Sequence, residues 1–173
     1  MLASGICHSD LTLTSGPMFK YPRVAGHEGA GFIKALGPNL KDKDLKEGDP
    51  VLLSFRFCGQ CLNCKNHLPS CCDAFPLNLV GQNDSFLSED GKGEINGSFF
   101  GQSSFAQLSV VQESCIIPAK DSIQSDEELK LFSPLGCGYQ TGAGAVLNIA
   151  RPSKEQSIMV AGLGGVGLAA IMV

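Results

Sequence analysis

The sequence contains no apolar run long enough to cross a membrane. A spanning helix needs about 18 consecutive apolar residues, and no stretch of this 173-residue chain approaches that length. The first 13 residues also lack the basic segment and the apolar core of a secretory leader. We therefore expect an intracellular, cytoplasmic protein that does not enter a membrane.

Long runs of charge of one sign are also missing. The 13 basic and 17 acidic residues give a net charge of −4 and are mixed along the chain. Nucleic acids and anionic membrane surfaces attract a concentrated basic patch, so we expect neither as a partner. No internal repeat or low-complexity tract occurs, and the length and the 43% hydrophobic content suit one domain with part of a second.

Short apolar runs separated by glycine predict a β-rich domain with many turns. The chain has 21 glycines, and the apolar runs lie at residues 29–36, 51–57, 105–111 and 115–118. A polar, turn-forming segment at residues 83–97 predicts an exposed loop.

The pattern changes after Ser133, where glycine and alanine become frequent over residues 135–149. This segment predicts a helix that ends near Ala150, since Arg151-Pro152 would interrupt it.

Cysteine spacing carries the strongest chemical signal. Five of the eight cysteines lie between Cys58 and Cys72, and Cys58, Cys61, Cys64 and Cys72 have the spacing C-x2-C-x2-C-x7-C. Tetrahedral Zn²⁺ takes four thiolates, and two-residue spacers let a tight turn direct successive sulfurs to one point. Such a site leaves no open coordination position, so we predict a structural zinc. An iron–sulfur cluster and disulfides are the alternatives, and spacing alone leaves Cys71 open as the fourth ligand.

A glycine-rich turn lies near the end of the sequence. Residues 157–161 predict a short strand, and an apolar helix is predicted from Leu168. Between them, Gly162-Leu163-Gly164-Gly165-Val166-Gly167 fits G-x-G-x-x-G, which in this context cradles a pyrophosphate at a helix N-terminus. An ordinary tight turn is the alternative. The acidic residue that distinguishes NAD from NADP is expected about 20 residues further on, so the choice between them stays open.

Three more residues with metal-binding chemistry stand far apart: Cys7, His27 and Cys137. No local spacing rule joins them. A lone cysteine is usually a small buried apolar residue, and a histidine beside a glutamate, as at His27-Glu28, is often a structural pair.

Five ordered motifs together resemble the zinc-dependent alcohol dehydrogenases of the medium-chain superfamily. They are Gly5-Ile-Cys-His-Ser-Asp10, Gly26-His-Glu-Gly-Ala-Gly31, the cluster from Cys58 to Cys72, Gly136-Cys-Gly-Tyr-Gln-Thr-Gly142 and Gly162-Leu-Gly-Gly-Val-Gly167. Within that family, residues 96–106 and 135–144 are most similar to benzyl- and aryl-alcohol dehydrogenases.

The resemblance implies a mainly β fold: a GroES-like barrel catalytic domain with a structural zinc lobe over residues 1–140. The first strand and turn of a Rossmann α/β domain would follow in residues 141–173, with strands expected before Gly5 missing. It also implies hydride transfer to NAD or NADP from a primary alcohol, which we expect to be aromatic, with an aldehyde as the product. For the full-length protein it implies a homo-oligomer. A truncated fragment that binds zinc without turnover is the alternative. A zinc-free reductase is a weaker one, because Cys7, His27 and Cys137 are intact.

The resemblance further implies two Zn²⁺ per chain, the second held for catalysis by Cys7, His27 and Cys137. Ser9 would relay the alcohol proton, Asp10 would orient His27, and Glu28 would be a nearby carboxylate, although turn and capping roles are the alternative for these three. Thr12 replaces a histidine of many family members, so the relay would end at water or at the cofactor ribose. The cofactor contacts would come from His8, Thr141, Gly162, Gly164, Gly165, Val166 and Gly167, with a plain surface position as the alternative for His8.

Overall fold

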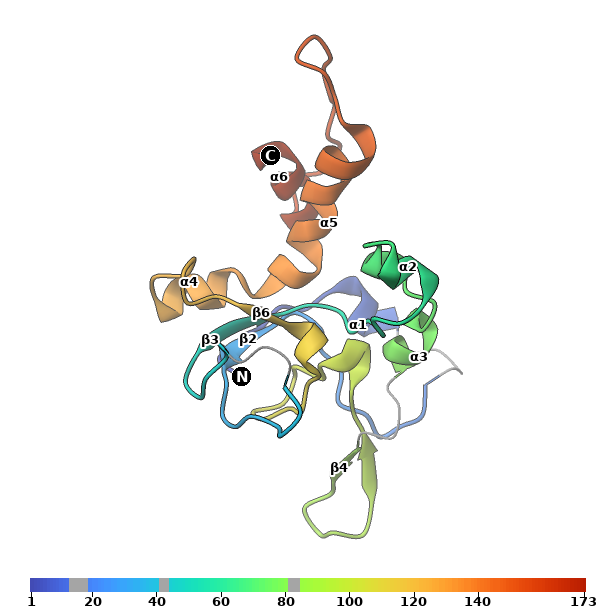
Figure 1. Ribbon diagram of the computed structural model, residues 1–173, viewed down its shortest axis with the longest axis vertical. Helices are drawn as coiled ribbons and strands as arrows, with labels where there is room; N and C mark the ends of the chain where they lie inside the picture. The colour runs from blue at the N-terminus through green and yellow to red at the C-terminus, as the bar shows by residue number, and fades with distance from the viewer. Residues whose placement is uncertain (13–18, 41–43, 81–84) are drawn as a thin grey trace.

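A four-stranded antiparallel sheet forms the centre of the protein. The computed structural model describes residues 1–12, 19–40, 44–80 and 85–173 (Figure 1). The strands are β1 (Ala3–Ser4), β2 (Gly29–Phe32), β3 (Pro50–Leu53) and β6 (Ile116–Pro118), in the spatial order β1-β2-β3-β6. Ala30 lies opposite both Ala3 and Leu52, and Leu52 lies opposite Ile117. Three of the four predicted apolar runs therefore supply three of the four strands of this sheet, and β1 comes from none of the runs.

One core lies between this sheet and helix α4 (Asp126–Leu131). The buried residues Ala30, Leu52, Ala119 and Leu129 form it. The Ser125 side chain caps α4 by accepting a hydrogen bond from the Glu128 N–H, and three acidic residues occupy the first turn, where they offset the helix dipole. Ser125 therefore defines the start of α4, and the helix places Leu129 against the sheet.

A second core is aromatic. Phe19, Phe99 and Phe100 form its buried part, with Ala25, Phe55, Leu79 and Val80 packed against it. It lies where α3 (Phe75–Val80) packs against η3 (Phe99–Gly101). The other short elements in this part of the protein are α1 (His8–Thr12), α2 (Leu62–Lys65), η2 (Pro69–Cys71) and η4 (Glu113–Cys115). These elements bring the cysteine cluster and the N-terminal motif to the same side of the sheet (Figure 1).

Two sequence predictions about the loops differ from the structure. Within the exposed loop predicted for residues 83–97, β4 (Ser85–Leu87) pairs with β5 (Glu94–Asn96), and the polar residues turn between them. Residues 83–84 lie outside the described part. The apolar run at residues 105–111 forms no strand, and its Val110 is 87% exposed. Apolar composition alone does not supply the hydrogen-bonding neighbour that a strand requires.

The C-terminal part is helical. After η5 (Ser133–Gly136), α5 (Gly138–Gly144) continues as a π-helix (Ala145–Ala150), which confirms the helix predicted to end near Ala150. Helix α5 leaves the body of the molecule, and α6 (Gly165–Met172) lies beside it (Figure 1). None of the described helices is long and apolar enough to span a membrane.

The C-terminal part differs from one prediction of the sequence and leaves another untested. The strand predicted for residues 157–161 was wrong for this structure, because the segment pairs with no described strand, and α6 begins at Gly165, before the predicted Leu168. Helix α5 runs without a break through residues 140 and 141, so the proposed domain division there stays a prediction.

Candidate metal centres

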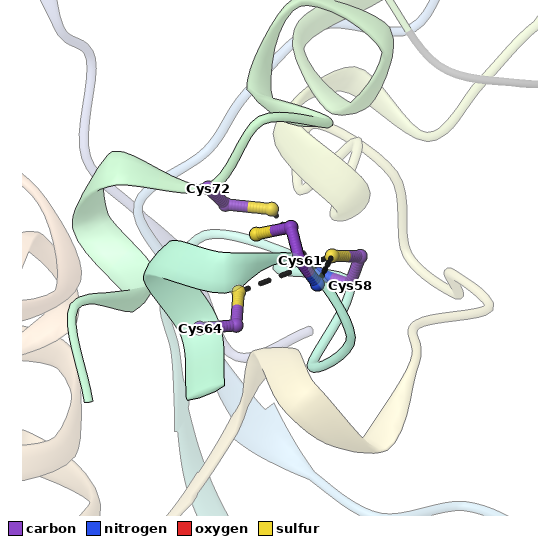
Figure 2. A group of neighbouring side chains, drawn as sticks. All are labelled: Cys58, Cys61, Cys64 and Cys72. Carbon is purple, nitrogen blue, oxygen red and sulfur yellow. Dashed lines mark hydrogen bonds between the residues drawn. The ribbon is translucent and has the colours of Figure 1, made fainter. Parts of the chain in front are cut away.

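The first candidate centre is the four-cysteine cluster. The sulfurs of Cys58, Cys61, Cys64 and Cys72 all lie within 4.8 Å of one another. Figure 2 shows the four side chains converging from the loop before α2, from α2 itself and from the residue after η2. Tetrahedral coordination of one zinc by four thiolates is the chemistry that this donor set fits.

Backbone amides support the sulfurs of this cluster. The N–H groups of Gln60 and Cys61 each donate to the Cys58 sulfur at 3.4 Å, and the Cys58 N–H donates to the Cys72 sulfur at 3.3 Å. The first two bonds lower the pKa of the Cys58 thiol, whereas desolvation and the neighbouring Cys61 raise the pKa of Cys64. The Cys58 and Cys64 thiols thus differ in how readily they ionise, and a divalent metal would favour the thiolate form of both.

The fourth member of the cluster is Cys72 and not Cys71. Cys72 is buried within it, while Cys71 is exposed and its sulfur lies 4.0 Å from the Ser70 hydroxyl. The Asn63 side-chain amide donates to the Cys71 carbonyl at 2.8 Å and to Asp73 at 2.9 Å, which fastens the returning chain beside α2. The structure thus brings the sulfur of Cys72 to the other three, and its role as the fourth ligand stays a prediction.

The second candidate centre joins residues from three distant segments. The ligand atoms of Cys7, His27, Glu28 and Cys137 lie within 4.8 Å of one another, and the Cys7 and Cys137 sulfurs are 3.9 Å apart. His27 Nε2 is buried and has no hydrogen-bond partner. An unpartnered buried nitrogen beside two thiols fits a metal ligand, because such atoms otherwise carry a desolvation cost.

Asp10 connects two of these residues. Its Oδ1 lies 3.2 Å from His27 Nδ1 and accepts the Gly26 N–H at 3.0 Å, while its Oδ2 accepts the Cys7 N–H at 2.9 Å. The carboxylate is buried, so these bonds are not weakened by water. A carboxylate that accepts a hydrogen bond from Nδ1–H leaves the lone pair of Nε2 free for a metal, which is the tautomer that metal-binding histidines require.

The negative charges of Cys7 and Glu28 in the second centre disfavour a third negative charge on Cys137. Burial works against ionisation of Cys7, but hydrogen bonds from Ser9 and the neighbouring His27 prevail and lower the pKa of the thiol. Burial, then the charges of Cys7 and Glu28, raise the pKa of Cys137. Glu28 itself is held in place, since its Oε1 accepts the Gly138 N–H at 3.2 Å. Two thiols and a carboxylate at this separation are a cation-binding set.

The residues expected to move the alcohol proton lie on α1. Ser9 is half-buried, and its hydroxyl lies 3.7 Å from the Cys7 sulfur. One turn later, the Thr12 hydroxyl donates to the Ser9 carbonyl at 3.0 Å and is exposed. A hydroxyl beside the centre is therefore followed by one at the surface. His8 begins α1 and is exposed, so its expected cofactor contact remains a proposal.

Thr141 and the glycine turn are the other expected cofactor contacts. Thr141 lies one turn along α5 from Cys137, and its hydroxyl donates to the Cys137 carbonyl at 2.7 Å. In the turn, an added Cβ at Gly167 would lie 1.9 Å from the Gly162 carbonyl oxygen, so glycine is required for this close approach. The turn opens directly into α6 with Gly164 as its N-cap, and Gly165 and Val166 form the first helical turn. Their roles with a cofactor stay predictions.

The aromatic surroundings of His27 had no individual signal in the sequence. The rings of Phe100, Phe99 and Phe55 lie 4.5, 5.4 and 6.0 Å from the His27 ring, between centroids. A single phenylalanine in a sequence predicts only a core residue, and the residues that its ring contacts become known only from the fold. The fully buried Gln102, which bonds to the His27 backbone at 2.9 Å, was missed for the same reason.

Comparisons with known proteins point to one family. Residues 1–121 match the family described as the alcohol dehydrogenase GroES-like domain. A probable alcohol dehydrogenase from a Pseudomonas species is 41% identical over 98% of this chain and 53% of its own length. Geraniol dehydrogenase from Castellaniella defragrans is 42% identical over 97% of this chain and 44% of its own length. The chain thus spans about half the length of the curated relatives it matches.

Two solved structures that are similar to this chain point to the same family. The crystal structure of an alcohol dehydrogenase zinc-binding domain protein from Burkholderia ambifaria superposes with a TM-score of 0.84 at 37% identity, over 98% of this chain and 46% of that one. The structure of benzyl alcohol dehydrogenase from Acinetobacter calcoaceticus superposes with a TM-score of 0.82 at 35% identity, over 99% of this chain and 45% of that one.

Proposed function

The chain belongs to the alcohol dehydrogenase family of GroES-like domains, and from this premise we propose that it carries the zinc centres of an alcohol-oxidising enzyme. Membership confirms the family and the GroES-like fold that the five ordered motifs predict. The family is one of zinc-dependent enzymes. The observation that carries the proposal is the convergence of Cys7, His27 and Cys137 around an unpartnered buried nitrogen.

We assign one metal to each candidate centre. Cys58, Cys61, Cys64 and Cys72 close a shell of four thiolates and hold the lobe around α2 together. At the other centre, Cys7, His27 and Cys137 supply three ligands, and a zinc ion held there would provide a Lewis acid with one open position for a hydroxyl. Both centres need reduced thiols, which a cytoplasmic location would maintain.

The side chains near the open centre have distinct tasks in this proposal. Asp10 accepts a hydrogen bond from Nδ1–H of His27, and this bond fixes the direction in which Nε2 points. Ser9 takes the alcohol proton, and since Thr12 stands where many relatives have a histidine, the proton leaves to water or to a cofactor hydroxyl. Glu28 adds negative charge beside the centre and is held by the first residue of α5.

NAD or NADP would supply the hydride acceptor. Glycines at 162, 164, 165 and 167 let the backbone N–H groups at the start of α6 face a pyrophosphate, with His8 and Thr141 as further contacts. A homo-oligomer is expected for the polypeptide of full family length. These assignments rest on the glycine turn, on the helix that follows it and on the family.

We propose a primary aromatic alcohol as the substrate, with the matching aldehyde as product. Three phenylalanine rings surround His27, within 6.0 Å between centroids. Phe99 and Phe100 are buried in the aromatic core and Phe55 is only partly buried, so of the three rings Phe55 is the one that could meet a benzyl group, at the about 4.5–7 Å that aromatic pairs favour. The structural similarity to a benzyl alcohol dehydrogenase points in the same direction.

Steady-state kinetics test this proposal. The polypeptide that carries this chain should oxidise benzyl alcohol with a higher kcat/KM than ethanol, with NAD⁺ and NADP⁺ each tried as acceptor. Cys137→Ala should abolish turnover, and Cys71→Ala, which changes an exposed cysteine outside both centres, should leave it intact. A clear preference for ethanol would refute the aromatic substrate, and turnover that survives Cys137→Ala would refute the assigned centre.

A metal-binding unit without turnover is the second candidate. One observation favours it: residues 157–161, which precede the glycine turn, pair with no described strand, whereas a dinucleotide site is built at the edge of a completed parallel sheet. Zinc at both centres combined with no reduced cofactor in the assay above would support this second candidate.

A further inference from the structure

We propose that Gln102 is a positioning residue for the centre formed by Cys7, His27 and Cys137. Its side-chain amide holds the backbone of His27 and the end of β3 in one fixed relation. The inference rests on the proposed function in that it takes this centre to be a metal site.

The hydrogen bonds of Gln102 are directed at three backbone groups. Its Nε2 donates to the carbonyls of His27 and Ser54, each at 2.9 Å, and its Oε1 accepts the Gly29 N–H at 3.2 Å. The residue is fully buried. A primary amide has two N–H donors and one carbonyl acceptor, so every group of this side chain that requires a partner in the interior has one.

These bonds reach two of the three expected ligands. His27 is held directly at its carbonyl. Ser54 directly follows β3, and its hydroxyl lies 3.5 Å from the carbonyl of Gly136, the residue before Cys137. The packing there is tight, since a Cβ at Gly136 would lie 1.8 Å from the Leu53 carbonyl oxygen. Gln102 therefore links the backbone that carries the histidine to the strand end against which the Cys137 segment rests.

Gln102 and Asp10 act on opposite ends of His27. Asp10 fixes the ring through Nδ1, at 3.2 Å, and Gln102 fixes the main chain through the carbonyl. A ring oriented on a mobile backbone would leave Nε2 free to shift relative to the two sulfurs. Metal affinity depends on such outer partners, because they set where the ligand atoms stand before the metal arrives.

The backbone that presents Gln102 is strained. Ser98, Phe100 and Ser103 adopt positive φ angles of 55°, 52° and 51°, a region that costs non-glycine residues about 1–3 kcal/mol each. The Ser103 hydroxyl fixes this conformation by donating to the Val24 carbonyl at 2.8 Å and accepting the Phe99 N–H at 2.9 Å. Strain held in place next to a metal centre is what a positioning role requires.

Cadmium-113 resonance spectroscopy on the full chain tests the proposal, because it reports each metal centre separately. The unaltered chain should give two resonances, and Cys61→Ala, which removes one of them, assigns the four-cysteine centre. Gln102→Met keeps the length of the side chain and removes all three hydrogen bonds. It should move the resonance of the centre at His27 and weaken its cadmium affinity by about tenfold or more, while the four-cysteine resonance and affinity stay unchanged.

Two further variants separate positioning from general stability. Leu129→Ala opens a cavity in the sheet core, which contains no ligand of either centre, so it should lower stability without moving either resonance. Gln102→Glu keeps the acceptor for Gly29 but turns the donor side into a carboxylate facing two carbonyls, and it answers the question if the methionine variant does not fold. Unmoved resonances in a folded Gln102 variant would overturn the inference. Only one resonance in the unaltered chain would instead overturn the proposed function.

Discussion

At the residue scale, the Asp10 carboxylate orients the His27 ring in the centre that we propose to bind a metal. It binds the ring at Nδ1 and the Cys7 N–H at once, so one side chain orients two ligands. Its pKa is lowered: burial opposes the shift, but His27 and the N–H groups of Cys7 and Gly26 prevail. The carboxylate is therefore charged at neutral pH and remains a hydrogen-bond acceptor.

We predict that Asp10→Asn weakens metal binding at this centre by about 10- to 100-fold, since an amide is a weaker partner for the histidine ring than a carboxylate. Chelator competition with zinc measures it. Asp90→Asn, in the exposed hairpin turn, serves as the control. Equal zinc affinity in the Asp10 variant and the control would show that the carboxylate has no role in ligation.

A second residue-scale prediction concerns Cys115, which is fully buried and belongs to neither centre. Burial raises the pKa of its thiol from 9.0 to about 11. Because the unfolded thiol ionises first, its contribution to stability is complete below pH 9 and is lost as pH rises toward 11. The loss is on the order of 2–3 kcal/mol at about 1.4 kcal/mol per pKa unit.

Urea unfolding of the unaltered chain and of Cys115→Ala across pH 8–11, at equal zinc load, should therefore show a steeper alkaline decline in the unaltered chain. Parallel declines in the two proteins would mean that the buried thiol ionises as easily as an exposed one.

Residue types and spacing reveal only part of these sites. The four cysteines lie on one short loop, so their spacing alone predicts a shared metal. Cys7, His27 and Cys137 come together through the fold, and only the resemblance of whole motifs joins them in advance. Gln102 lies in the segment 96–106 that carries part of the resemblance, but it has no individual signal, because a glutamine beside small polar residues has the same sequence pattern whether it is buried or exposed.

At the element scale, the contact of η5 with β3 sets the position of Cys137. Gly136 lies so close to β3 that an added Cβ would be 1.8 Å from the Leu53 carbonyl oxygen. The first residues after it carry the cysteine ligand and the N–H that binds Glu28. A change of one atom at this contact should therefore be felt at the metal centre.

We predict that Gly136→Ala lowers the free energy of unfolding by about 1–3 kcal/mol through overpacking and also weakens zinc binding. The matched control is Gly144→Ala at the end of α5, where the nearest atom to a Cβ is 3.6 Å away; there we expect a gain of about 0.5–1 kcal/mol. Thermal unfolding and zinc titration compare them. A Gly136 variant as stable as the Gly144 variant would contradict the tight contact.

The elements themselves were predicted unevenly. Apolar runs at residues 29–36, 51–57 and 115–118 contain strands because each has a neighbour that completes its hydrogen bonds. The runs at 105–111 and 157–161 have similar composition and form no strand. Composition indicates which segments tolerate an extended backbone. The pairing of strands, however, depends on segments that are distant in the sequence, so local composition cannot predict it.

At the scale of the whole molecule, the two centres differ in how their ligands are supplied. The four cysteines come from one lobe, and the other proposed ligands come from the N-terminal motif, from two residues before β2 and from the N-cap of α5. Zinc at the four-cysteine centre would stabilise a lobe of short helices, whereas zinc at the other centre would depend on the entire fold. The first should therefore be retained longer during chelation.

Native mass spectrometry of the zinc-loaded chain tests the central claim most directly. We expect two zinc ions in the unaltered chain, one in Cys61→Ala, one in Cys137→Ala and none in the double variant, with Cys71→Ala still holding two. Two zinc ions retained in Cys61→Ala, or a single zinc in the unaltered chain that Cys137→Ala leaves in place, would contradict the assignment of two separate centres.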